Sequence, residues 1–152
     1  MKVREIMTQP VIVVKEETTL GEIARIMLAN RIGCVPVVDA EGKLVGIVTE
    51  TDFTAKERGV PFSTFDAPQL LGKWMPDEGI EEIYNAARKM TAKEIMTSPV
   101  ITLTEDDLIE EAVKKLLSYD ISRIPVVRNG IPIGIVSQHD LLKLMIRDRG
   151  AD

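Results

Sequence analysis

The feature that most constrains the fold of this chain is an internal repeat. When the sequence is shifted by 89 positions, KVREIMTQPVIVV (2–14) aligns with TAKEIMTSPVITL (91–103). RIGCVPVVD (31–39) then aligns with DISRIPVVR (120–128), and after a one-residue deletion GKLVGIVTETD (42–52) aligns with GIPIGIVSQHD (130–140). Three matched segments in the same order indicate a duplicated structural unit.

Each copy predicts the same succession of elements. A β-branched run at 11–14, and again at 100–103, predicts a strand. Two short strands joined by a Gly-containing turn come later, and in the second copy the turn is Asn129–Gly130, a strong hairpin signal. A further helix is expected after GIVT and after GIVS. A helix with one apolar face is predicted between the first strand and the two short strands, because apolar residues recur there at helical spacing. They are Leu20, Ile23, Ala24, Met27 and Leu28 in the first copy, and Leu108, Ala112, Val113, Leu116 and Leu117 in the second.

A β-α-β-β-α unit of about 50 residues is too small to bury a stable core alone. Its strands are apolar on both faces and therefore need cover on both sides. We expect an α/β (α+β) fold in which the two units pack sheet to sheet about an approximate two-fold axis. Such a pairing would create two equivalent clefts between the halves.

Composition and charge exclude several classes of function. The 152 residues carry a formal net charge of −5, which argues against nucleic-acid binding because that activity needs a basic face. No apolar run approaches the ~20 residues of a membrane span, and the N-terminus has no apolar signal core, so we expect a cytoplasmic protein. One cysteine, Cys34, and one histidine, His139, cannot assemble a zinc site, and the chain contains neither G-x-S-x-G nor a Gly-rich phosphate loop. The sequence therefore predicts no catalytic or metal site, and no enzyme.

The matched phrases GIVTETDF (46–53) and GIVSQHDL (134–141) each place a hydroxyl three residues before an aspartate. Thr49 with Asp52, and Ser137 with Asp140, fit a capping box at a helix N-terminus, with Asp in place of the usual Glu or Gln. The same groups suit a ligand, because a helix N-terminus attracts phosphate and a carboxylate can accept hydrogen bonds from two vicinal hydroxyls. The residues leave both interpretations open, and the two are compatible.

The order EIMT-x-PV, helix, h-P-V-V, turn and G-h-V-[ST]-x-x-D resembles the CBS domain, and two copies in tandem resemble a Bateman module. The resemblance covers residues 1–55 and 91–147, so we expect a first repeat at 1–55, a structured insert at 56–90 and a second repeat at 91–152. It implies a stand-alone regulatory module that binds AMP, ADP, ATP or S-adenosylmethionine in its clefts, requires no other cofactor and signals to a separate partner protein. The alternative is a structural or dimerisation module whose clefts stay empty.

The resemblance also implies roles for individual residues. Asp52 and Asp140 would accept hydrogen bonds from the ribose 2′ and 3′ hydroxyls, and Thr49 and Ser137 would lie near the phosphate. The adenine would lie against the EIMT-x-PV segments, which corresponds to Ile6, Val11 and Ile12 in one half and Ile95, Val100 and Ile101 in the other.

The two clefts are expected to differ in charge. Just before the h-P-V-V strand the second repeat has Arg123, whereas the first has Cys34. In the family this position often reaches the phosphates in the partner half's cleft, so Arg123, and with it His139, would serve the Thr49–Asp52 site. That cleft should then bind phosphorylated nucleotide more tightly. The plainer interpretations are a surface charge for Arg123, an exposed first-turn residue for His139 and a small buried filler for Cys34.

The insert at 56–90 has no counterpart in the repeat. It contains Phe62, Phe65 and Trp74, and its end, IEEIYNAARKM (80–90), predicts a helix with Ile80, Ile83, Tyr84 and Ala87 on one face. Such bulk suits a segment that covers an apolar edge of the module or one that forms a partner surface. Because Bateman modules often pair through their helices, the resemblance also implies a homodimer.

Overall fold

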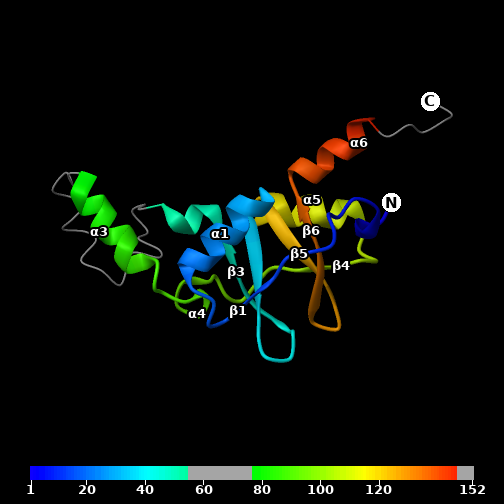
Figure 1. Ribbon diagram of the computed structural model, residues 1–152. Coiled ribbons are helices and arrows are strands. Elements are labelled where there is room, and N and C mark those ends of the chain that lie inside the picture. Colours follow the sequence, from blue (N-terminus) through cyan, green and yellow to red (C-terminus); the bar gives the residue numbers. More distant parts are fainter. Residues whose placement is uncertain (55–76, 147–152) are drawn as a thin grey trace.

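The structure of the chain is a computed structural model that describes residues 1–54 and 77–146 (Figure 1). The aromatic residues of the predicted insert, Phe62, Phe65 and Trp74, lie outside the described residues. The first half contains η1 (Val3–Glu5), β1 (Val14–Lys15), α1 (Leu20–Asn30), β2 (Cys34–Val38), β3 (Leu44–Thr49) and η2 (Glu50–Phe53). The second half contains α3 (Asp77–Ala87), α4 (Ala92–Ile95), β4 (Leu103–Thr104), α5 (Ile109–Ser118), β5 (Arg123–Arg128), β6 (Ile131–Ser137), η4 (His139–Leu142) and α6 (Lys143–Ile146).

Each half builds one three-stranded sheet, in the order β1-β2-β3 and β4-β5-β6. In both sheets the first pair of strands is parallel, with the helix as the crossover, and the second pair is an antiparallel hairpin. Asn129 and Gly130 form the two-residue turn between β5 and β6 with φ of 53° and 82°, the positive values that a tight hairpin needs. The predicted mixed α and β fold of two repeated units is confirmed.

The predicted helix faces are narrower than the sequence suggested. Three residues in each helix are buried at the spacing of one face: Leu20, Ile23 and Met27 in α1, and Ile109, Ala112 and Leu116 in α5. Leu108 is the N-cap of α5 and is 53% exposed, so placing it on the buried face was wrong. Leu28 and Leu117 are 79% and 78% exposed, so placing them there was wrong as well. Each follows the last buried residue directly, and one residue turns the helix by about 100°, which carries the side chain off the sheet.

The first strand of each repeat is also shorter than predicted, because the chain before it crosses between the two sheets. Thr8 forms an antiparallel bridge with Ile135 of the second half, yet Val14, six residues later, pairs with Val37 of the first half. The second repeat does the same in reverse: Thr97 bridges to Ile47 and residues from Leu103 onward join the other sheet. The segments 9–13 and 98–102 are therefore extended crossovers rather than strands.

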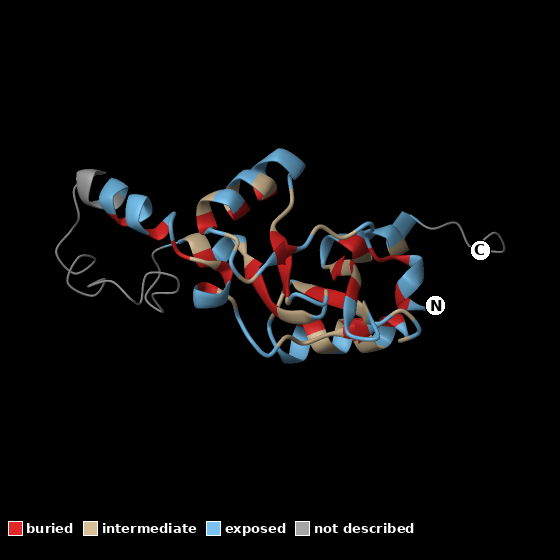
Figure 2. Ribbon diagram, turned by 60° about the horizontal axis from the view of Figure 1, so that its bottom comes forward, coloured by how far each residue is buried: buried red, intermediate tan, exposed pale blue. Residues whose placement is uncertain are grey.

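This exchange divides the core in a way that does not follow chain order. Val3, Ile6 and Met7 are buried with residues of β4, α5, β5 and β6, whereas Met90, Ala92 and Ile95 are buried with residues of α1, β2 and β3. In Figure 1 the N-terminal residues accordingly lie beside α5, and α4 lies beside α1 and β1. Figure 2 shows the buried residues concentrated along the strands and on the inner sides of the helices.

A glycine in the hairpin of each half accommodates the exchanged segment. The Met96 side chain packs directly over Gly46, and the Met7 side chain packs over Gly134. A Cβ atom at Gly46 would lie 2.9 Å from the Cβ atom of Met96, closer than such atoms approach in proteins. Glycine at these two positions thus permits the close approach of each EIMT segment to the opposite sheet.

The helix predicted near the end of the insert is present as α3. Ile83 and Ala87 are buried in the first core, as their spacing predicted. The Tyr84 hydroxyl donates a hydrogen bond to the carbonyl of Phe53 at 2.6 Å, so α3 also fastens the end of the first repeat.

Candidate functional site

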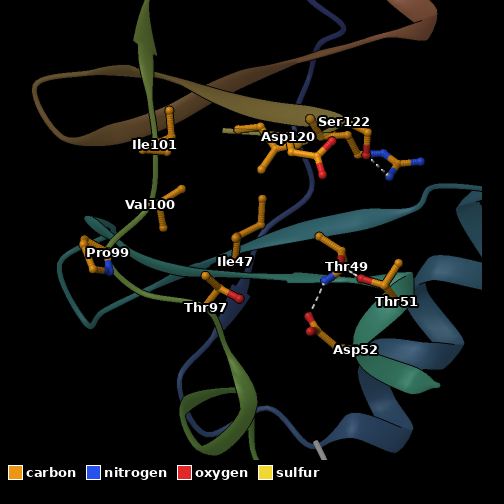
Figure 3. A pocket seen from close by; sticks show the side chains of 12 residues that line it. Ile47, Thr49, Thr51, Asp52, Thr97, Pro99, Val100, Ile101, Asp120 and Ser122 are labelled. Atoms are coloured by element: carbon orange, nitrogen blue, oxygen red, sulfur yellow. Dashed lines mark hydrogen bonds between the residues drawn. The ribbon is translucent and has the colours of Figure 1, made fainter. Parts of the chain in front are cut away.

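A cavity of about 700 Å³ opens between the two halves at the end of β3 (Figure 3). Both halves contribute to its lining, because the 98–102 crossover passes over the end of the first sheet. The lining residues are Ile47, Thr49, Thr51 and Asp52 from the first half, and Thr97, Pro99, Val100, Ile101, Asp120, Ile121, Ser122 and Arg123 from the second.

Asp52 and Thr49 form the predicted capping box at the start of η2. The Thr49 backbone N–H donates to Oδ2 of Asp52 at 2.8 Å. Among the described residues no hydrogen bond to Oδ1 is present, although Asp52 is only 9% exposed and lines the cavity. The cap therefore uses one carboxylate oxygen and leaves the other available to a ligand.

The environment of Asp52 also affects its protonation. Burial raises the pKa of the Asp52 carboxyl above its ordinary value, and the hydrogen bonds from the Thr49 backbone and side chain only partly offset that effect. A bound hydroxyl pair would donate to the charged form and would therefore lower this pKa again.

One wall of the cavity is apolar. Val100 and Ile101 of the crossover lie along it, and Ile47 of β3 lies between them and Thr49 in Figure 3. These side chains offer a surface on which a flat ring could lie. Ile95, which the resemblance assigned to this pocket, is instead 3% exposed within the first core, because it sits on α4 before the crossover begins.

Arg123, at the start of β5, reaches the same cavity as Asp52. Its guanidinium lies over Gly33, and its Nη2 atom is 3.5 Å from Oε1 of Glu50. The Arg123 side chain is 27% exposed, so it is neither buried nor a free surface charge. A cation at this place could meet an anionic ligand group, but it shares its charge with Glu50.

Cys34, the counterpart of Arg123 in the repeat, is buried as the plainer interpretation proposed. Burial raises the pKa of its thiol to about 11, with a smaller opposing effect from Arg123. It therefore stays protonated at neutral pH and offers no charge to a ligand.

The equivalent groups of the second repeat are arranged differently. Asp140 is 2% exposed, and its Oδ2 accepts hydrogen bonds from the Ser137 backbone N–H at 2.9 Å and from the Ser137 hydroxyl at 3.2 Å. Its Oδ1 accepts from the Thr8 hydroxyl at 2.8 Å and lies 2.8 Å from Nζ of Lys143. Burial acts to raise the pKa of Asp140, but these hydrogen bonds and the Lys143 charge outweigh it, and the pKa lies below its usual 3.8.

The other residues that were assigned to the expected second cleft do not line the Asp52 cavity. Val11 and Ile12 are half-buried on the 9–13 crossover, and Ile6 is 2% exposed within the second core. His139 is exposed at the start of η4 and is not among the residues that line the Asp52 cavity. The expectation that it faces that cavity with Arg123 therefore finds no support in the geometry.

Sequence reasoning missed several polar residues of the Asp52 cavity. Thr51 and Ser122 directly adjoin residues that were singled out, and the Thr51 hydroxyl is 2.8 Å from that of Thr49. Asp120 was missed because its role depends on backbone conformation: it follows α5 with a φ of 51°, and in Figure 3 its carboxylate points into the cavity. The sequence feature that could have identified Asp120 is its charge, three positions before Arg123.

The chain belongs to the CBS domain family: the family's model matches residues 3–58 and 92–147. Among solved structures, the chain is similar to the CBS domain of a CBS domain containing membrane protein from Sphaerobacter thermophilus, with 42% identity and a TM-score of 0.73 over 97% of this chain and 90% of that one. It is also similar to the CBS domain pair of protein MJ0100 in complex with 5′-methylthioadenosine and S-adenosyl-L-methionine, with 30% identity and a TM-score of 0.69 over 95% of each chain.

Curated relatives differ in how much of their length the match occupies. The chain is 34% identical to the uncharacterized protein MJ1426 of Methanocaldococcus jannaschii over 96% of its own length and 92% of that protein. It spans only 31% and 23% of the length of two further relatives, so in those proteins the matching region is one part of a longer chain. The activities of such longer proteins are not carried by the similarity itself.

Within 1–54 and 77–146, no helix is both long and apolar enough to cross a membrane. In the same ranges, no group of three or more His, Cys, Asp or Glu side chains is placed to hold a metal ion.

Proposed function

We propose that this chain is a regulatory module, not an enzyme, and that it binds an adenosyl ligand in the cavity beside Asp52. The observation that carries the proposal is the carboxylate of Asp52, whose Oδ1 accepts no hydrogen bond from the part of the chain that the structure describes, at one end of a cavity with an apolar wall. The similarity to the MJ0100 domain pair, whose structure contains two adenosyl compounds, supports the same ligand class.

In this proposal each part of the ligand meets a matching surface. Asp52 accepts hydrogen bonds from the two ribose hydroxyls, since an ionised carboxylate is acceptor-only and can serve both. The adenine lies against Val100 and Ile101, which removes apolar surface from water. The group attached to the ribose 5′ carbon extends toward Thr49 and Arg123.

The charges of the cavity narrow the choice of ligand. Arg123 is paired with Glu50, and the Asp120 carboxylate lines the same space. A chain of two or three phosphates would meet one shared cation and an additional anion, which is unfavourable. We therefore expect AMP or a sulfonium compound such as S-adenosylmethionine to bind more tightly than ADP or ATP.

A ligand in this cavity would touch both halves of the module at once, because the lining comes from both. It would favour whichever arrangement of the halves closes around it, by no more than its difference in affinity between the two arrangements. In the proposed mechanism a separate partner protein detects that shift. The partner itself is to be identified.

The helices support a proposal about assembly as well. Leu28 on α1 and Leu117 on α5 occupy equivalent positions in the repeat, and both are largely exposed. Each borders a hollow, of about 560 Å³ at Leu28 and about 690 Å³ at Leu117. We propose a homodimer in which a second copy of the chain, turned about a two-fold axis, covers these exposed leucines.

Calorimetric titration tests the ligand proposal. AMP, ATP, S-adenosylmethionine and 5′-methylthioadenosine are titrated into the unaltered protein, Asp52→Ala and Asp140→Ala, with thermal unfolding as a second readout. Binding should disappear in Asp52→Ala and persist in folded Asp140→Ala. A larger loss of affinity in Asp140→Ala would show that the ligand binds beside Asp140 and not beside Asp52. The absence of a thermal shift with any ligand at millimolar concentration would favour a structural module with empty clefts.

Light scattering after size-exclusion chromatography tests the assembly proposal. Leu28→Asp and Leu117→Asp place a charge on the proposed interface, while both side chains are too exposed to matter for folding. The expected result is a monomer in each variant and a dimer in the unaltered chain. A dimer that survives both substitutions would show that the copies meet elsewhere.

A further inference from the structure

Asp52 and Asp140, which are equivalent in the repeat, have different hydrogen-bond partners. A carboxylate offers about four acceptor positions. Asp140 uses all of them on the backbone N–H and hydroxyl of Ser137, the Thr8 hydroxyl and the Lys143 ammonium. Asp52 accepts hydrogen bonds from the backbone N–H and the side chain of Thr49 alone, and among the described residues no group from another segment donates to its carboxylate.

Lys143 makes the difference between the halves, and it joins two distant parts of the chain. Its Nζ atom is 2.8 Å from Oδ1 of Asp140 and donates to the backbone carbonyl of Ile6 at 2.9 Å. In the first repeat the residue three positions after Asp52 is Ala55, which has no side-chain donor. The sequence thus provides the ammonium in one half only.

Thr8 completes the arrangement from the other side. Its hydroxyl donates to Asp140, and its backbone N–H and carbonyl form the bridge to Ile135, with N···O distances of 2.8 and 3.1 Å. Thr97, its counterpart, forms the same bridge to Ile47 but lines the open cavity and makes no such bond to Asp52. Asp140, Lys143 and Thr8 together fasten the N-terminal segment to the second half.

We propose that this clamp of Asp140, Lys143 and Thr8 closes the second cleft to ribose, so that the module takes a single adenosyl ligand, beside Asp52. Lys143 is the residue that selects between the clefts. A ribose at Asp140 would have to displace the Thr8 hydroxyl and the Lys143 ammonium, and with them two attachments of the N-terminal segment. The predicted number of bound ligands rests on the proposed function, whereas the clamp itself is inferred from the contacts described above.

The decisive variant is Lys143→Met, which keeps an unbranched apolar stem and removes the ammonium. Calorimetry with S-adenosylmethionine and with AMP should count one site per chain in the unaltered protein and two in Lys143→Met. Lys143→Arg, which keeps a cationic donor, should count one. Asp52→Ala combined with Lys143→Met should again count one, and that site belongs to the Asp140 cleft.

Two sites in the unaltered protein, or no added site in Lys143→Met, would overturn the inference. If the unaltered protein bound neither compound while Lys143→Met bound one, the clamp would be supported and the proposed function at Asp52 would fail. A ligand-free measurement completes the test: Asp140→Asn, Lys143→Met and their combination are unfolded in urea. The double variant should lose less than the sum of the single losses, and strictly additive losses would refute the clamp.

Discussion

Replacing Arg123 with methionine should weaken the binding of AMP while leaving adenosine almost unaffected. The guanidinium lines the cavity that holds Asp52, and it is the charged group of β5 that can meet a 5′ phosphate there. A hydrogen bond to a charged group contributes about 1.5–3 kcal/mol. Because the Arg123 side chain is 27% exposed, we take a value of about 2 kcal/mol from that range, which corresponds to a roughly 30-fold higher Kd for AMP.

A substitution at Glu50 provides a matched variant that should change the affinity for AMP in the opposite direction. It is 3.5 Å from Arg123 and 63% exposed, and exposed ion pairs contribute only about 0.2–1 kcal/mol. Glu50→Gln should release Arg123 for the ligand and tighten AMP by about twofold, on the scale of such a surface pair. Adenosine, which has no phosphate, should change by less than about twofold in both variants, on the same scale.

The assay is calorimetric titration of AMP and adenosine into the three proteins at one fixed salt concentration, because screening weakens phosphate contacts. Thermal unfolding checks that methionine, whose stem can still cover Gly33, leaves the fold intact. An equal loss of affinity for AMP and adenosine in Arg123→Met would refute the reasoning, since Arg123 would then shape the cavity rather than contact phosphate.

Three further predictions test other parts of the structure. Asp140→Asn should cost about 2 kcal/mol of unfolding free energy, since the amide nitrogen that replaces one carboxylate oxygen cannot accept a hydrogen bond and the charge that pairs with Lys143 is lost. Because the pKa of Asp140 is lower in the folded state, this stabilisation is present above pH 3.8 and is lost as the pH falls through the folded pKa. The unfolding free energies of the two proteins in urea should therefore converge in acid. A constant difference between them would contradict the assignment. Gly46→Ala should destabilise the fold by about 1–3 kcal/mol in urea unfolding through collision with Met96, and an unchanged midpoint would disprove the close approach. Asp120→Asn should tighten ATP roughly threefold relative to adenosine in calorimetry, as expected for one partly screened charge, whereas equal changes would remove Asp120 from the phosphate side.

Local patterns in the sequence determined much of this protein. The duplication predicted two like units, helical spacing located α1 and α5, and Asn129–Gly130 predicted the hairpin of the second sheet. The capping box of Thr49 and Asp52 was predictable for the same reason, because it involves residues within one turn of chain. The error over Leu28 and Leu117 arose because spacing locates an apolar stripe but not the width of the sheet that covers it.

Only the tertiary structure decided how the two aspartates differ. The crossovers carry residues 98–102 over Asp52, and they bring Thr8 to Asp140 across 132 positions of sequence. Lys143 meets the Ile6 carbonyl across 137 positions, and no local pattern encodes such a contact. The sequence shows that Lys143 follows Asp140 and Ala55 follows Asp52, but it does not show what these residues contact. In the structure, groups from distant segments help to occupy both oxygens of Asp140, whereas among the described residues no distant group donates to Asp52.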